Sequence, residues 1–213
     1  MNLDFTLIVI DLPSHGKSEI LSELSLDLYV EVIKGLVESL QIKKFILCGH
    51  SLGGAIAQSY YFKHPIEIIS LILVSTGARL RVSPVILKLT KENFKEYLDS
   101  IRAGGFYRKT PKEIVDSFIQ ETSRMDNMVV HRDYSICDKF DVMEKISSIN
   151  VPCLIICGNA DKLTPLKYSK FFADNIKNSK LITINNTGHM VMLEKPDEFN
   201  QAIDDFIKNN LKL

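Results

Sequence analysis

The chain has 213 residues, 46% of them hydrophobic, and its 26 Lys and Arg residues balance its 26 Asp and Glu residues. This length suits one domain with a real core, and the balanced charge argues against disorder, a nucleic-acid surface and a polybasic membrane anchor. No apolar run is long enough to span a bilayer, and residues 1–5 lack the basic region of a signal peptide. We therefore expect a cytoplasmic protein that binds neither nucleic acid nor a membrane.

The first predicted element is a strand at Phe5–Ile10, because a nearly continuous β-branched apolar run is typical of a strand buried on both faces of a parallel sheet. A loop marked by Pro13 and Gly16 follows. Apolar residues then recur at helical spacing and predict an amphipathic helix over residues 26–40.

Residues 45–54 read FILCGHSLGG, and a segment of helical character continues to Lys63. An apolar strand, a Gly-x-Ser-x-Gly turn and a helix together indicate a nucleophile elbow, which lifts the Ser51 hydroxyl clear of the sheet. Gly49 and Gly53 lack a Cβ, so we expect strand and helix to pass close to the turn there. The first N–H groups of the helix favour negative charge near the serine oxygen. The alternative is a plain glycine-rich turn.

Another buried strand is predicted at residues 68–74, and continuous strand runs are then absent from Ser75 to Asn150. Helical segments are predicted here instead, with Thr110 capping the third and Pro111 in its first turn. These segments cover residues 85–89, 92–101 and 111–122. A helical insertion between two strands has the shape of a lid over an active site, although ordinary crossover helices are the alternative.

The remaining chain alternates strands and helices, which implies an α/β fold with a mainly parallel sheet and flanking helices. The predicted elements are a strand at 151–157, a helix at 165–175, a strand at 180–184 and a helix at 198–211. We divide the chain into a first core part with the elbow, a helical lid and a second core part, at residues 1–76, 77–150 and 151–213.

Three predicted strands end in side chains that suit nucleophilic catalysis, namely Ser51, Asp161 and His189. Reactive side chains collect at the carboxyl ends of parallel strands. A serine hydroxyl needs a base to take its proton, which His189 does near neutral pH, and Asp161 would orient the imidazole. Taken singly, Asp161 is also a helix cap or an Asx turn, and His189 an ordinary surface histidine. Their joint placement favours a catalytic triad.

Other histidines, acids and cysteines have plainer interpretations. We expect His50 to support the elbow, and His15 to line a pocket or to lie in a plain loop. His64 and His131 are expected to be structural or solvated, and Asp141 is a less favoured partner for His189. The four cysteines are predicted to be reduced thiols, with Cys48, Cys153 and Cys157 buried in strands, and we expect no metal site.

Further motifs surround these residues: DLPSHGKS at 11–18, Phe140-Asp141, GNADKLTP at 158–165 and Gly188-His189-Met190 with Glu194-Lys195-Pro196. With them the chain resembles the α/β-hydrolase superfamily, in its branch of esterases, enol-lactonases and C–C hydrolases. The order Ser, Asp, His along the chain is the order of that superfamily. The resemblance implies an α/β-hydrolase fold, with the Leu52 N–H in the oxyanion hole. The serine at the elbow argues against haloalkane dehalogenases and epoxide hydrolases, which carry aspartate there.

One feature departs from the family. Its members have further strands and a His-Gly loop ahead of the segment that matches Phe5–Ile10, and that loop supplies a second oxyanion donor, worth about a hundredfold to a thousandfold in rate. A strand between this segment and the elbow strand is also unmatched, so we expect an N-terminally shortened sheet. Either the two strands pair directly, or another chain fills the gap, as in a homodimer, or the chain is a truncated product.

The sequence thus predicts a serine hydrolase that cleaves a small or medium carboxylic ester, thioester or lactone without a cofactor. We expect aromatic residues of the lid, with neighbouring residues, to line an apolar pocket for the acyl group. The alternative is that these aromatic residues only anchor the lid helices. The candidate pocket residues are His15, His50, Phe106, Tyr107, Phe118 and Met190. Two alternatives are hydrolysis of a C–C bond in a diketone by the same triad, and an inactive remnant that serves as a binding protein.

Overall fold

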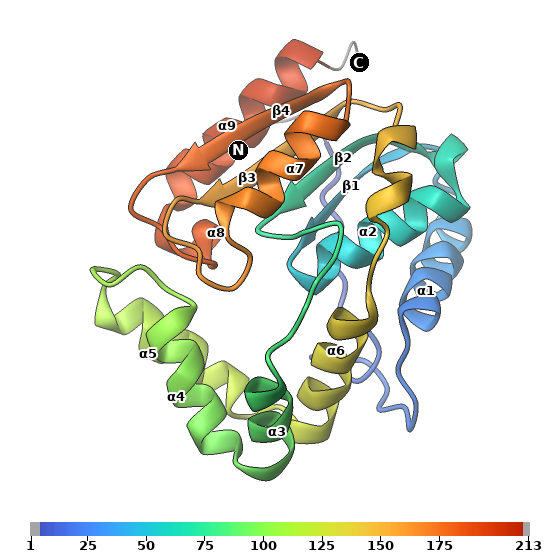
Figure 1. Cartoon of the computed structure of the whole chain (residues 1–213). Coiled ribbons are helices and arrows are strands. Elements are labelled where there is room, and N and C mark those ends of the chain that lie inside the picture. The colour runs from blue at the N-terminus through green and yellow to red at the C-terminus, as the bar shows by residue number, and fades with distance from the viewer. Residues whose placement is uncertain (1–4, 211–213) are drawn as a thin grey trace.

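The computed structural model describes residues 5–210, and its four strands form one parallel sheet in the order β1-β2-β3-β4 (Figure 1). The strands are β1 (Phe45–His50), β2 (Ile68–Val74), β3 (Cys153–Gly158) and β4 (Ser179–Ile184). Every adjacent pair is parallel, so the four carboxyl ends lie at one edge of the sheet. The predicted α/β fold with a parallel sheet is confirmed.

Alternate residues of the central strands are buried against different helices. Leu71 and Ile155 belong to a core shared with α1, α2 and α7, whereas Ile72 and Leu154 pack against α9. The bounds are α1 (Leu26–Ser39), α2 (Leu52–Lys63), α7 (Leu166–Asn175) and α9 (Pro196–Asn210). These helices match the predicted ones within a few residues, while the predicted last residue, Leu211, lies outside the described range. Burial on both faces explains why these strands are continuous apolar runs.

Between β2 and β3 the chain forms a helical insertion, which we define as residues 84–139. It holds α3 (Pro84–Glu92), α4 (Phe94–Gly104), α5 (Lys112–Thr122) and α6 (Asn127–Lys139). Figure 1 shows these green to yellow helices gathered apart from those that cover the sheet. The three predicted helices are confirmed, but α6 was not predicted. The cap assigned to Thr110 is wrong, because Pro111 is the N-cap of α5 and the Thr110 hydroxyl donates to Glu194 instead.

The predicted strand at Phe5–Ile10 does not form. Leu7 and Val9 are 79% and 85% exposed, and within residues 5–210 the one strand paired with β1 is β2. Direct pairing of this segment with the elbow strand is therefore wrong. A strand depends on backbone partners in a neighbouring strand, so an apolar β-branched run without such a partner stays irregular.

Cys48 is exposed, contrary to the prediction, whereas Cys137, Cys153 and Cys157 are buried and unpaired. Cys48 lies beside Ile72 in register, on the α9 side of the sheet, but it belongs to the edge strand β1, whereas α9 packs on β3 and β4. Burial raises the pKa of the Cys153 thiol to about 12, so this cysteine is an inert part of the core. In the described part of the chain, no helix combines the length and apolarity needed to cross a membrane.

Candidate active site

Ser51 occupies a strained turn between β1 and α2, with φ 53° and ψ −116°. A side-chain-bearing residue in such a region costs about 1–3 kcal/mol, so the surrounding structure must hold it there. The Ser51 N–H donates to the Val74 carbonyl at 3.0 Å, and the Thr76 hydroxyl donates to the Ser51 carbonyl at 2.8 Å. The turn has the geometry that a nucleophile elbow requires.

Glycine is required at two positions of this turn, but one of them is not the predicted one. A Cβ on Gly49 would lie 2.0 Å from the Gly53 carbonyl oxygen, and a Cβ on Gly54 would lie 2.5 Å from the Thr76 side chain. A Cβ on Gly53 would meet nothing within 4 Å. The close approach expected at Gly53 is therefore wrong, and the tight contact on the helix side belongs to Gly54.

Ser51→Gly is expected to stabilise the fold while removing the nucleophile. Glycine adopts positive φ without steric cost. We therefore expect the free energy of unfolding of Ser51→Gly to exceed that of Ser51→Ala by about 1 kcal/mol. Urea unfolding of both variants measures this difference. Ser51→Ala is the matched control because it also lacks the hydroxyl but keeps the Cβ. A glycine variant no more stable than the alanine variant would show that the turn stores no strain.

Asp161 and His189 form a buried hydrogen-bonded pair, 6% and 3% exposed, with 2.9 Å between Oδ2 and Nδ1. Asp161 Oδ1 accepts from the backbone N–H groups of Leu163 and Thr164, each at 2.9 Å, and Oδ2 accepts from the Thr164 hydroxyl at 2.8 Å. Burial raises the pKa of Asp161, but the His189 and Thr164 bonds outweigh it and hold the pKa below its ordinary value. The Asp161 carboxylate thus forms the Asx turn and also binds His189, so the two interpretations of this residue do not exclude each other.

The loops that carry this pair are joined through their backbones. A Cβ on Gly158, at the end of β3, would lie 2.2 Å from the carbonyl oxygen of Gly188. The Ala160 N–H donates to the Thr187 carbonyl at 3.0 Å. These contacts fix the loop of the acid against the loop of the base.

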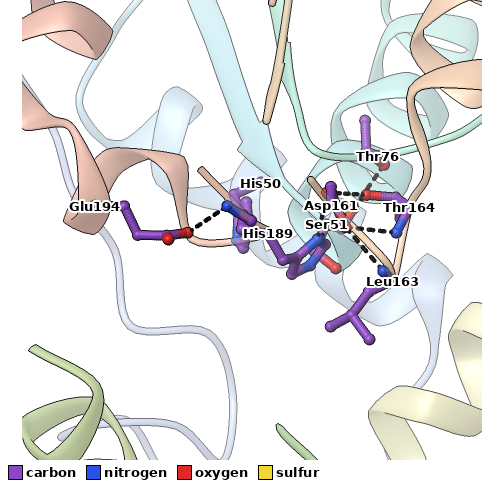
Figure 2. A network of polar contacts seen from close by, with 9 residues as sticks. His50, Ser51, Thr76, Asp161, Leu163, Thr164, His189 and Glu194 are labelled. Carbon is purple, nitrogen blue, oxygen red and sulfur yellow. Dashed lines mark hydrogen bonds and ion pairs between the residues drawn. The ribbon is translucent and has the colours of Figure 1, made fainter. Parts of the chain in front are cut away.

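His50 connects the base to the elbow. Its Nε2 lies 3.0 Å from the His189 carbonyl oxygen, and the two ring centroids are 4.7 Å apart. Burial and the neighbouring His189 lower the pKa of His50 to about 3, so the ring is neutral and its Nε2–H donates to that carbonyl. Figure 2 shows Ser51, the residue after His50, among the residues of this network. The contact agrees with a supporting role for His50.

The Ser51 hydroxyl makes no hydrogen bond with His189 in the part of the chain that is described. Such bonds are often long until a substrate is bound. Leu52 opens α2, and among residues 5–210 its N–H has no acceptor, so this donor is available beside Ser51.

Apart from His50, the predicted pocket residues lie in two places. Phe106, Phe118 and Met190 share an apolar cluster with Val115, so the insertion packs directly on the residue after His189. Phe106 and Tyr107 line a cavity of about 420 Å³. Their role in substrate binding stays a prediction.

His15 lies apart from this cluster and binds the insertion through α6. Its Nε2 lies 2.8 Å from Asp133 Oδ2 on α6, and its Nδ1 lies 2.9 Å from the Pro13 carbonyl oxygen. The bond to Asp133 raises the pKa of His15, against the opposing effect of burial. Two acceptors suit the doubly protonated ring, and the bond to Asp133 joins this loop to α6.

The sequence analysis missed one polar residue that contacts the pair and one that binds the residue beside it, and one suggested partner lies elsewhere. Thr164 binds Asp161, and Glu194 binds the Gly188 N–H next to His189. Asp141, considered as a partner for His189, lies 3.6 Å from Arg79 and 3.8 Å from Arg81. The sequence signals were present, since Thr164 follows Asp161 closely and Glu194 belongs to a quoted motif, but neither indicated its contact.

A profile of the alpha/beta hydrolase family matches residues 2–202. The chain belongs to this family. The resemblance inferred from the motifs and the predicted α/β-hydrolase fold are thereby confirmed, as is hydrolase chemistry at the level of the family.

Relatives of this alpha/beta hydrolase differ in the substrates that their names record. The 2-hydroxy-6-oxononadienedioate/2-hydroxy-6-oxononatrienedioate hydrolase 1 of Pseudomonas putida is 29% identical, over 97% of this chain and 79% of the relative. The 3-oxoadipate enol-lactonase 1 of Acinetobacter baylyi is 23% identical, over 96% of this chain and 79% of the relative. The solved structure of a thermophilic esterase is 40% identical, with a TM-score of 0.85 and coverage of 94% and 80%.

Proposed function

We propose that this alpha/beta hydrolase cleaves a small or medium carboxylic ester, thioester or lactone through an acyl-enzyme. The buried Asp161–His189 pair carries the proposal, because such a pair keeps a neutral imidazole oriented as a base and stabilises its protonated form. The strained Ser51 turn follows β1 at the same edge of the sheet, and the likeness to an esterase at 40% identity supports the ester class.

In the proposed mechanism the Ser51 oxygen attacks the carbonyl carbon while His189 takes the hydroxyl proton. The Leu52 N–H donates to the oxygen that becomes negative in the tetrahedral intermediate. The bond from carbon to the alkoxy or thiolate group then breaks, and His189 gives its proton to that leaving group. Water, deprotonated by His189, attacks the acyl-enzyme. The bond between the acyl carbon and the Ser51 oxygen breaks, His189 returns the proton to that oxygen, and the acid is released. The helical insertion acts as the lid, with its Phe106 and Phe118 cluster supplying apolar surface for the acyl group.

A second candidate is hydrolysis of a carbon–carbon bond in a diketone by the same residues. The Pseudomonas putida relative favours it, because the substrate in its name carries a 6-oxo group and a 2-hydroxydiene but no ester. Initial rates with p-nitrophenyl esters, thioesters, lactones and 2-hydroxy-6-oxo-dienoates separate the two reactions. The predicted homodimer and cytoplasmic location stay predictions.

The first experiment is labelling of the purified chain by a fluorophosphonate, which reacts with activated serines. We expect labelling of the wild type and none of Ser51→Ala or His189→Ala, since the reaction needs nucleophile and base. A folded, monodisperse wild type that resists labelling and hydrolyses none of the substrates would refute the proposal. That result would favour the inactive remnant that binds a partner instead.

A further inference from the structure

Glu194 ends α8 (Val191–Glu194), and its carboxylate binds two separate segments of the chain. Oε1 accepts from the backbone N–H of Gly188 at 2.8 Å, and Oε2 accepts from the backbone N–H of Tyr107 at 2.8 Å. Oε2 also accepts from the Thr110 hydroxyl. Gly188 directly precedes the base His189, whereas Tyr107 and Thr110 lie in the segment that joins α4 to α5. In Figure 2, Glu194 and Asp161 approach the His189 segment from opposite sides.

The joining segment, residues 105–110, also touches the base directly. The His189 N–H donates to the Gly105 carbonyl oxygen at 2.9 Å. A Cβ on Gly188 would lie 2.7 Å from the carbonyl carbon of Phe106, so the two backbones are in contact without an intervening side chain. A displacement of the joining segment would therefore disturb the backbone of His189.

A carboxylate suits this junction because all three partners are donors. Charge-assisted hydrogen bonds of this kind are about twice as strong as neutral ones. Glutamine has nearly the same shape but carries one NH₂ group, which would face either the Gly188 N–H or the donors of Tyr107 and Thr110. One side of the junction would then lose its acceptor, and an unmade hydrogen bond in a half-buried place is costly.

We propose that Glu194 is a positioning residue that couples the helical insertion to the base. The junction keeps His189 aligned toward Ser51 while the joining segment is docked, and it releases the base when that segment moves away. The proposal rests on the function proposed above, because it assigns this coupling within the same acyl-transfer site.

The test compares Glu194→Gln with Glu198→Gln. Glu198 is an exposed residue near the start of α9 that pairs with Lys195 at 3.1 Å, so it is a matched control for the loss of one surface charge. We expect kcat/KM for a p-nitrophenyl ester to fall by about tenfold to a hundredfold in Glu194→Gln, mainly through kcat, because a small misplacement of a catalytic group is costly. Glu198→Gln is expected to keep wild-type kinetics.

Proton NMR gives a readout that does not depend on turnover. The Nδ1–H proton between His189 and Asp161 is shielded from water, and we expect its resonance to shift or broaden in Glu194→Gln but not in Glu198→Gln. Thr110→Val removes one donor and keeps the carboxylate, so we expect a smaller loss of kcat. The loss in the double variant should be less than the product of the single losses, because both changes break the same junction.

The outcomes separate this proposal from the proposed function. A folded Glu194→Gln with wild-type kcat/KM and an unchanged Nδ1–H resonance would overturn the coupling. If Glu194→Gln does not fold, Thr110→Val decides the matter by the same two measurements. If the wild type neither labels nor hydrolyses esters, the proposed function fails, and the NMR comparison still tests whether Glu194 positions His189.

Discussion

Gly49→Ala is expected to destabilise the protein by about 3 kcal/mol or more, whereas Gly53→Ala should be tolerated. Both glycines belong to the same Gly-x-Ser-x-Gly motif, but a methyl group added at Gly49 would lie 2.0 Å from the backbone oxygen of Gly53. Backbone atoms cannot rotate away as a flexible side chain does, so β1 and α2 would have to separate. The elbow and the core between them would be lost together.

Gly53→Ala is the matched control because its added methyl group enters open space. Gly53 lies in the first turn of α2, where alanine is favoured over glycine by about 0.5–1 kcal/mol, so this variant should be unchanged or slightly more stable. Urea unfolding followed by circular dichroism measures both variants. Equal stability of the two would mean that the close approach at Gly49 does not constrain the fold.

The central strands of the sheet could be predicted because they are buried on both faces. The runs at β2 and β3 are continuous apolar segments whose alternate residues pack against helices on opposite sides. The run at Phe5–Ile10 has the same composition, yet it forms no strand. Apolar composition reports a capacity for burial, whereas a strand also needs a neighbour of the right register, and no periodicity within the segment reveals whether that neighbour exists.

The missed helix α6 has a different cause. Its sequence mixes charged residues among few buried apolar ones, chiefly Val129, Val130 and Cys137, so its hydrophobic pattern is weak. A start signal was present, since the side chain of Asp126 caps the helix by accepting from the Met128 N–H at 2.7 Å. Capping signals deserve more weight where apolar periodicity is faint.

The candidate site was predictable where its residues follow strands, and unpredictable where they meet across the chain. Ser51, Asp161 and His189 each stand just beyond a strand, and the structure brings the last two within hydrogen-bond distance. Glu194 accepts from a residue 87 positions away in the sequence. Local pattern carries no information about such a contact, which depends on how the insertion packs on the loop after β4.

Asp161→Asn is expected to leave the fold intact and to reduce kcat by about ten-thousandfold. Asp161 Oδ1 accepts from two backbone N–H groups, those of Leu163 and Thr164. The amide oxygen of asparagine must take this position, because an NH₂ group there would face two donors. The NH₂ group is then left in the place of Oδ2, which faces His189 Nδ1 at 2.9 Å.

That arrangement changes the tautomer of His189. An NH₂ group donates to Nδ1, so Nδ1 must be unprotonated and the ring proton must sit on Nε2, the nitrogen that would accept the Ser51 proton. The base is present but in the wrong tautomer. The rate of ester hydrolysis at neutral pH measures the loss. The matched control is Asp141→Asn, which changes an exposed acid beside Arg79 and is expected to keep full activity. An Asp161→Asn enzyme within about tenfold of the wild type would mean that Asp161 supports the loop of residues 158–164 and not the base.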